Sequence, residues 1–291
     1  MDSTGQSYSP RNPKCSESLE STKTMMNVLV TGHKGYIGQH LCKMIRQSRP
    51  EINLFGLDKS GIAEDRQDIC QRFYSDVVYN TVIHLAAKVR VGESVNKPTL
   101  YYDTNINGTL NILDCVQHHN FVFASTGVAS NPGSPYGYSK RVAEDIVAEK
   151  CYDYTIFRFY NVTGTDGFPA TNPDGLFYNL AEATRTGEFN LYGTDYDTKD
   201  GTCVREYVHV NDICESLIRA IDEPANGIEN LAYGDTRTTR EIIDTFKEVN
   251  NVDFKVNELP RRAGDLEACH LDKPSKYMIQ RYSYEEMLKL Y

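Results

Sequence analysis

Short apolar runs alternate with helical patterns along the first half of this chain, and this alternation constrains its fold more than any other feature. The runs lie at 27–31, 52–57, 81–86, 121–125 and 154–159, and the helical patterns lie at about 37–47, 98–118 and 135–150. Short buried strands that alternate with helices predict a parallel sheet covered by helices on both faces. The sequence therefore predicts a doubly wound α/β domain.

Length and charge narrow the class of protein further. The chain has 291 residues, which is enough for one large or two modest domains. Its 31 basic and 40 acidic side chains give a net charge of -9, which argues against a nucleic-acid partner or an anionic membrane surface. No apolar run approaches the roughly 18 residues that span a bilayer, and the N-terminus lacks the apolar core of a signal peptide. We therefore expect a cytoplasmic protein that does not associate with membranes.

The cysteines and histidines do not form a recognisable metal-binding pattern. Eight cysteines are scattered along the chain, without a C-x-x-C pair or a histidine pair at ligand spacing. We expect them to be reduced, and we predict neither a metal site nor a disulfide framework. His118 and His119 are adjacent at a predicted helix end, where we expect a solvated pair or a partner for the helix dipole.

Changes in composition suggest how the chain is divided. Residues 1–25 are rich in Ser, Thr, Pro and charge and are predicted to be a disordered tail. Residues 26–160 carry the alternating pattern and form the predicted first domain. The chain then becomes rich in Gly, Pro and Asn, and a smaller second domain is predicted over 161–291, with a helix near 176–186. Segments within 206–235 are expected to return to the first domain.

Three glycines, Gly32, Gly35 and Gly38, lie between the first apolar run and the first helical pattern. Such a turn places backbone N–H groups and the positive end of a helix where a pyrophosphate can bind. Asp58 ends the second run and is placed to accept a hydrogen bond from a ribose 2′-hydroxyl and to repel a 2′-phosphate. The arrangement favours a Rossmann domain that binds NAD, although glycines that serve only helix packing are an alternative. Asp76 is either a candidate contact for the adenine end of the NAD or an ordinary surface acid.

A Y-x-x-x-K pair at a helix start is the strongest catalytic signal. Ser134 and Pro135 are typical of a helix start, so Tyr136 and Lys140 are expected one turn apart on one face. A tyrosine base at pH 7 needs its pKa lowered by roughly 3 units from about 10, which is about 4 kcal/mol. An ammonium about 4 Å away supplies on the order of 4 kcal/mol at an effective dielectric constant near 20. Lys140 is therefore predicted to supply nearly all of the lowering of the Tyr136 pKa, although Y-x-x-x-K pairs also occur by chance.

Seven sequence words, in order, resemble the extended short-chain dehydrogenase/reductase family, and within it the UDP-glucose 4-epimerases, over about residues 27–275. The words are TGHKGYIG (31–38), VIHLAAKVRVGES (82–94), YYDTNINGTLNIL (101–113), YGYSK (136–140), RFYNVTG (158–164), DGTCVREYVHVND (200–212) and LPRRAGDL (259–266). The resemblance implies an enzyme that uses bound NAD to interconvert UDP-glucose and UDP-galactose through a 4-keto sugar. It also implies a homodimer formed through the helices near 98–118 and 135–150.

The resemblance also implies roles for individual residues. Tyr136 as phenolate would accept the proton of the sugar 4-hydroxyl, Lys140 would lower its pKa and bind the nicotinamide ribose, and Thr126 would bond the sugar 4-oxygen. Ser125 is the fallback for Thr126. The other residues placed at the cofactor are Tyr36, Ile37, Asp76, Val77, Leu85, Ala86, Ala87, Asn105 and Phe159. The residues placed at the substrate are Tyr160, Asn161, Leu176, Asn190, Tyr192, Arg205, Arg262, Asp265 and Cys269.

The chain departs from the resembled pattern in ways that bear on its chemistry and fold. Dehydratases and decarboxylases on this scaffold carry an acid after the Ser/Thr, but here Gly127 follows, so epimerisation or simple reduction remains. The stretch 58–81 has room for about one helix and a short strand, and 76–81 cannot supply the dozen or more residues of a parallel crossover, so an outer strand or helix is expected to be missing. The stretch 126–136 is also short, so a more open sugar pocket is expected. Val89 and Gly175 replace a lysine and an asparagine, which puts one cofactor contact and one nucleotide contact in doubt.

Several alternatives remain open at this point. By resemblance, Cys269 lies near the C2 substituent of the sugar, where a cysteine leaves room for an N-acetyl group. The chain is thus also expected to accept UDP-GlcNAc and UDP-GalNAc. A nucleotide-sugar 4-ketoreductase, an epimerase of UDP-glucuronate or UDP-xylose, and a cofactor-sensing protein without turnover are the other hypotheses.

Overall fold

The computed structural model describes residues 25–62, 65–170, 172–262, 265–269 and 274–290. The predicted tail lies, apart from Met25, outside the described residues.

A six-stranded sheet forms the centre of the first domain, in the order β2-β1-β3-β4-β5-β9. Its strands are β1 (Met26–Thr31), β2 (Ile52–Leu57), β3 (Val78–His84), β4 (Gln117–Thr126), β5 (Asp153–Phe159) and β9 (Gly227–Leu231). Every neighbouring pair is parallel, so all six carboxyl ends lie along one edge. The predicted Rossmann sheet is confirmed, and β9 shows that the chain returns to it after entering the second domain.

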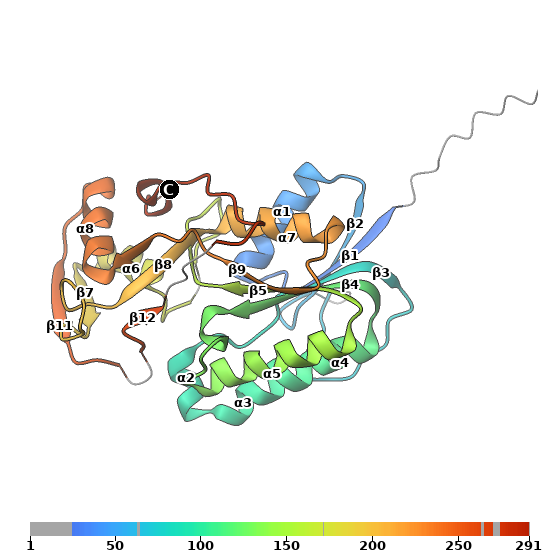
Figure 1. Ribbon diagram of the computed structural model, residues 1–291. Coiled ribbons are helices and arrows are strands. Elements are labelled where there is room, and N and C mark those ends of the chain that lie inside the picture. The colour runs from blue at the N-terminus through green and yellow to red at the C-terminus, as the bar shows by residue number, and fades with distance from the viewer. Residues whose placement is uncertain (1–24, 63–64, 171, 263–264, 270–273, 291) are drawn as a thin grey trace, which may run out of the picture.

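Helices cover both faces of this sheet (Figure 1). One face carries α1 (Tyr36–Ser48) and α7 (Val210–Asp222), and the other carries α2 (Val91–Asn96), α3 (Pro98–Tyr102), α4 (Gly108–Cys115) and α5 (Pro135–Lys150). A π-helical turn, Asp103–Asn107, joins α3 to α4, and a 3-10 turn, Gly127–Ala129, follows β4. Two apolar clusters fill the spaces between the sheet and these two helical layers.

The predicted start of α5 is confirmed in atomic detail. The Ser134 hydroxyl accepts a hydrogen bond from the Gly137 amide at 3.2 Å, and Pro135 is the first helical residue. The expected position of His118 and His119 at a helix end is wrong. Both lie in β4, because α4 ends at Cys115 and pairing with β3 extends β4 back to Gln117.

The shortened region between β2 and β3 matches the expectation of a trimmed cofactor domain. Its described residues form no helix or strand beyond an isolated bridge between Asp58 and Arg66. As a result β2 is an edge strand of the sheet.

The second domain is smaller and contains two separate sheets. The larger sheet consists of β6 (Asn161–Thr163), β8 (Val204–His209), β10 (Thr236–Thr238) and β12 (Ala268–Cys269), and the smaller pairs β7 (Glu188–Tyr192) with β11 (Lys255–Leu259). Its helices are α6 (Leu176–Thr186), α8 (Thr239–Asn250) and α9 (Tyr284–Met287). Leu180, Phe189 and Phe246 lie in the third apolar cluster, which holds these elements together.

Candidate active site

The glycine turn between β1 and α1 leaves no room for side chains. A Cβ atom at Gly32 would lie 2.8 Å from the Ala86 amide nitrogen, and one at Gly38 would lie 2.3 Å from the Gly32 carbonyl oxygen. Gly32 also has φ of +73°, which favours glycine. Gly35 is the N-cap of α1 and provides no side-chain cap. The first N–H groups of α1 therefore face a bare backbone cradle, which fits a pyrophosphate.

Asp58 lies beside this turn and is kept ionised. Its carboxylate accepts hydrogen bonds from the Lys34 amide at 3.2 Å and from the Ser60 amide at 2.9 Å and hydroxyl at 2.6 Å. Burial by itself would raise the pKa of this carboxyl, but the hydrogen bonds outweigh burial and lower it. An anionic acceptor at the end of β2 is what recognition of a ribose diol requires.

The chain that follows β3 packs directly against the glycine turn. The amides of Leu85 and Ala86 donate to the Thr31 carbonyl and hydroxyl at 3.1 and 3.2 Å. Asn105 is 1% exposed, and its amide bonds both the backbone of Lys88 and, at 2.8 Å, the Ser139 hydroxyl. It thus ties this loop to α5, and direct contact of Asn105 with the cofactor stays a prediction.

Tyr36 and Ile37 begin α1, as expected of residues at the cofactor turn. Asp76 and Val77 do not lie there. They precede β3, whose parallel strand of seven residues separates them by roughly 20 Å from the edge that carries the glycine turn. Their assignment to the adenine end is wrong, because the chain passes from Val77 directly into β3.

Tyr136, Lys140 and Thr126 meet at the carboxyl edge of the sheet. Tyr136 and Lys140 are 8% and 3% exposed, and Tyr136 forms a hydrogen bond with Thr126, the last residue of β4. The Lys140 ammonium lies 4.2 Å from the centre of the Phe123 ring. The predicted base is therefore buried and adjacent to its hydroxyl partner, and Thr126 itself is half-buried.

Lys140 alone does not lower the pKa of Tyr136 in the protein, and this part of the expectation is wrong. Burial raises the pKa of Tyr136 to about 12, against a smaller lowering by the hydrogen bond with Thr126. Burial also lowers the pKa of Lys140 to about 7, which Glu144 opposes. For both groups, loss of hydration on burial is the largest effect on the pKa.

Ser125 is not available to the sugar, unlike its neighbour Thr126. Its hydroxyl is buried and donates a 2.5 Å hydrogen bond to Glu144, which in turn accepts two hydrogen bonds from Arg158 at 2.9 and 2.6 Å. Successive residues of a strand point to opposite faces, so only one of the two hydroxyls can face Tyr136. The structure thus favours Thr126 over the fallback Ser125.

Gly127 is enclosed by Tyr160. A Cβ atom at Gly127 would lie 2.8 Å from Cε1 and 2.9 Å from Cζ of the Tyr160 ring. Phe159 ends β5 just before this ring and is 8% exposed. The space that a carboxylate after Thr126 would need is therefore occupied by an aromatic side chain.

Several predicted substrate residues gather in the second domain. In β7, Phe189 and Leu191 point into the core, so Asn190 and Tyr192 share the opposite face. The Arg262 guanidinium lies 5.0 Å from the centre of the Tyr192 ring and donates to Asp265 at 2.8 Å.

The remaining substrate candidates border β8. Arg205 donates to the carbonyls of Val204, Leu266 and Glu267, and Cys269 is its register partner across β8 and β12. The Asn161 amide donates to the Glu206 carbonyl at 3.0 Å, which joins β6 to β8. Leu176 begins α6 after Gly175, which provides no side-chain cap.

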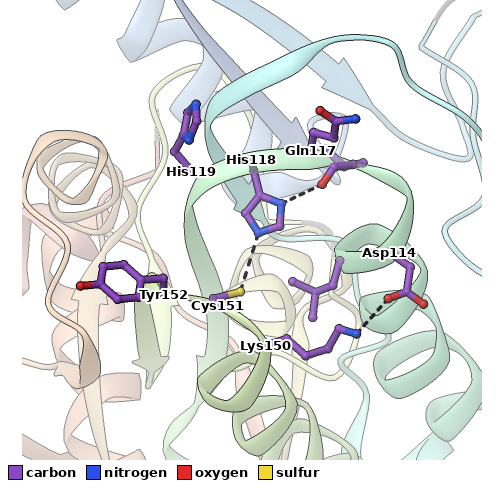
Figure 2. Close-up of a pocket in the computed structure, with 9 residues that line it drawn as sticks. Asp114, Gln117, His118, His119, Lys150, Cys151 and Tyr152 are labelled. Carbon is purple, nitrogen blue, oxygen red and sulfur yellow. Dashed lines mark hydrogen bonds and ion pairs between the residues drawn. The ribbon is translucent and has the colours of Figure 1, made fainter.

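A hollow of about 440 Å³ lies away from these residues (Figure 2). It surrounds the start of β4, at the amino ends of the strands. There His118 donates to the Val116 carbonyl at 2.8 Å and accepts a weak hydrogen bond from the Cys151 thiol at 3.7 Å. Burial raises the pKa of Cys151 to about 11, so this thiol is unreactive at neutral pH.

Sequence reasoning missed Glu144 and Arg158. Glu144 follows Tyr136 and Lys140 at four-residue spacing and is 1% exposed, a signal that was present in the helical pattern. Among the described residues no group of His, Cys, Asp or Glu side chains could hold a metal ion. None of the described helices combines the length and apolarity that crossing a membrane requires.

Comparison with known proteins agrees with this geometry. The model of the NAD dependent epimerase/dehydratase family matches residues 28–234. The UDP-glucose 4-epimerase of Rhizobium meliloti is 32% identical over 285 residues, which cover 82% of this chain and 86% of that protein.

Two solved structures have the same fold. The UDP-glucose-4-epimerase of Stenotrophomonas maltophila, with bound NAD and formylated UDP-arabinopyranose, is 25% identical with a TM-score of 0.78, over 90% of this chain and 96% of that one. The UDP-Glc/GlcNAc 4-epimerase of Campylobacter jejuni is 25% identical with a TM-score of 0.73, over 90% and 97%. The backbone cradle and Asp58 fit NAD, and this chain belongs to the NAD dependent epimerase/dehydratase family.

Proposed function

We propose that this protein is an NAD-dependent UDP-hexose 4-epimerase that interconverts UDP-glucose and UDP-galactose. The observation that carries the proposal is that buried Tyr136, at the start of α5, adjoins Thr126, at the end of β4, on the edge that also holds the glycine turn. Bound NAD supplies a transient acceptor for the C4 hydrogen and its electron pair. Tyr136 as phenolate accepts the proton of the 4-hydroxyl, Thr126 relays it, and Lys140 balances the phenolate charge.

The surroundings of Thr126 favour this reaction over elimination. Loss of a hydroxyl group from the sugar needs an acid close to the leaving oxygen. Gly127 supplies none, and the Tyr160 ring fills the space beside it. Reversible oxidation at one carbon therefore suits the site better than dehydration.

The second domain is proposed to hold the uridine diphosphate. Arg262 stacks near Tyr192 and pairs with Asp265, which together offer a guanidinium, an aromatic face and a ribose acceptor. Arg205 is proposed to reach the diphosphate, and its present bonds to backbone carbonyls hold it beside Cys269. The remaining proposed contacts are Tyr160, Asn161, Leu176 and Asn190.

The sugar specificity is proposed to include N-acetylated hexoses. Cys269 is half-buried, and the pKa of Tyr160 is raised to about 12, first by burial and then by the charges of Cys269 and Glu206. A small residue here leaves space beside the sugar. The neighbour named a UDP-Glc/GlcNAc 4-epimerase supports this range, and the neighbour with a UDP-pentose keeps a pentose substrate as the second candidate.

Incubation with UDP-galactose, UDP-GalNAc, UDP-glucuronate and UDP-xylose, without added reductant, tests the proposal. We expect C4 epimers of the first two, with catalytic amounts of NAD retained. Product formation that requires stoichiometric NADPH or NADH would instead identify a ketoreductase. Tyr136→Phe should abolish turnover and keep NAD bound, whereas Tyr152→Phe, the same change at a residue 92% exposed, should leave turnover unchanged.

A homodimer is part of the proposal. Exposed apolar side chains gather on α2, α3 and α5: Val95, Leu100, Tyr102, Tyr138 and Val142. They have exposed fractions from 37% to 55%, and the helices that carry them lie side by side on one face of the molecule (Figure 1). We expect a dimer in sedimentation experiments and a monomer for Tyr138→Glu; a wild-type monomer would contradict it.

A cytoplasmic location is the last part of the proposal. The seven described cysteines are all free, as expected in a reducing compartment. Cell fractionation of the tagged protein tests this.

A further inference from the structure

One face of α5 carries a buried row of polar groups at four-residue spacing. Tyr136, Lys140 and Glu144 are 8%, 3% and 1% exposed, and all three belong to successive turns of the same helix. Behind them, Arg158 of β5 is 9% exposed and bonds both oxygens of Glu144. When the phenol of Tyr136 is ionised, the charges along this row alternate in sign: the phenolate is followed by the lysine ammonium, the glutamate carboxylate and the arginine guanidinium.

The carboxylate is held in one place from two strands. Arg158 donates from Nε to Oε1 at 2.9 Å and from Nη2 to Oε2 at 2.6 Å, while Ser125 donates to the same Oε1. Ser125 immediately precedes Thr126, so the Glu144 carboxylate ties α5 to the strand that carries the proposed proton relay. A bidentate guanidinium contact fixes direction as well as distance.

We propose that Glu144, clamped by Arg158, is a positioning residue that keeps Lys140 an ammonium ion beside Tyr136 in the catalytic cycle. The inference rests on the proposed function, because it assigns Lys140 the task of balancing a phenolate. Glu144 touches neither sugar nor cofactor in this role and acts through Lys140.

Of the described groups packed around Lys140, Glu144 is the one that favours the protonated lysine. On β3, His84 is buried and neutral, because burial and Lys140 lower its pKa to about 3. On β4 the aromatic face of Phe123 lies next to the ammonium. On α5, burial lowers the pKa of Lys140 to about 7 and Glu144 is the group that opposes it. Glu144, one turn further along the same buried face of α5, is thus the acid that counters the burial of the lysine.

Substitution of Glu144 separates this role from simple bracing of the fold. In Glu144→Gln we expect the alkaline limb of the kcat/KM profile, set by loss of the ammonium proton, to move down by about one pH unit or more. Glu144→Asp should recover most of the shift. Glu149→Gln, the same change at an exposed acid of α5, should match the wild type.

A second readout does not depend on turnover. In NAD-loaded protein with labelled lysine, NMR titration of the Lys140 side chain should show the same downward shift in Glu144→Gln. If wild-type protein lacks epimerase activity, the proposed function fails while this titration still tests the inference.

A double variant covers the case in which Glu144→Gln does not fold. Glu144→Met with Arg158→Met removes both charges and keeps the interior packed. We expect it to show the downward shift as well. A folded, NAD-loaded Glu144→Gln or double variant whose lysine titration and alkaline limb equal those of the wild type would overturn the inference and leave the pair a structural brace.

Discussion

Replacing Lys140 with methionine is the most direct perturbation of the proposed base. The pKa of Tyr136 is about 12 in the protein alone, so at pH 7 only about one molecule in 10⁵ would carry a phenolate. A base that works near pH 7 needs this pKa lowered by roughly 5 units, or about 7 kcal/mol. In the complex with NAD, an ammonium about 4 Å from the phenolate would supply on the order of 4 kcal/mol of this lowering, which Lys140 does not supply in the protein alone. The remaining roughly 3 kcal/mol is assigned to the cationic cofactor, because the hydrogen bond with Thr126 is already part of the pKa of about 12.

Lys140→Met keeps the length and apolar stem of the side chain and removes the charge. Loss of about 4 kcal/mol predicts a fall in kcat/KM on the order of 10³-fold at pH 7. Activity should rise with pH in the variant, because a larger fraction of Tyr136 is then ionised, and the ultraviolet absorbance of tyrosinate should appear at higher pH. Cofactor content is measured in parallel, since Lys140 is also predicted to bind the nicotinamide ribose. A loss under tenfold with NAD retained, together with an unmoved tyrosinate titration, would refute the reasoning.

Three further predictions concern stability and cofactor binding. Arg158→Met leaves the Glu144 carboxylate buried without its guanidinium partner, so we expect the free energy of unfolding to fall by about 3–5 kcal/mol. The matched change at an exposed pair, Arg141→Met, should cost under about 1 kcal/mol. Equal losses in denaturant titrations would contradict this. Gly38→Ala places a Cβ atom 2.3 Å from a backbone oxygen in the glycine turn, so the purified variant should lack NAD; full occupancy by absorbance would count against the cradle. Burial lowers the pKa of His209 from 6.5 to about 4, so the unfolded chain takes up a proton at a higher pH than the folded protein does. The free energy of unfolding should therefore fall as pH drops from about 6.5 to 4, by up to about 3 kcal/mol. His209→Asn should flatten this dependence in thermal unfolding, and an unchanged slope would argue against it.

Local sequence signals predicted the elements whose ends are set locally. The second strand, α5 and α6 lie where the pattern placed them, because capping residues and breaks in the apolar runs define their ends. The start of β4 could not be predicted in this way. Pairing with β3 draws Gln117 and His118 into the strand, and this depends on a neighbour distant in sequence.

In the site, too, the features set by local sequence could be predicted and those set by distant contacts could not. The glycine turn, Asp58 and the Tyr136–Lys140 pair are local motifs, and their placement followed from the order of strands and helices. Asp76 was misplaced because a deletion moved the chain straight into β3. The clamp on Glu144 brings together residues from α5, β4 and β5, and no spacing in the sequence predicts which carboxylate meets Arg158.

The central claim is that hydrogen leaves C4 of the sugar and returns to the same carbon. UDP-galactose that carries deuterium at C4, incubated with the purified protein in ordinary water without added cofactor, tests it most directly. We predict UDP-glucose that retains the deuterium at C4, as read by mass spectrometry and NMR, and no such product with Tyr136→Phe. Product that has exchanged the label for solvent hydrogen, or no product from NAD-loaded wild-type protein, would contradict the account.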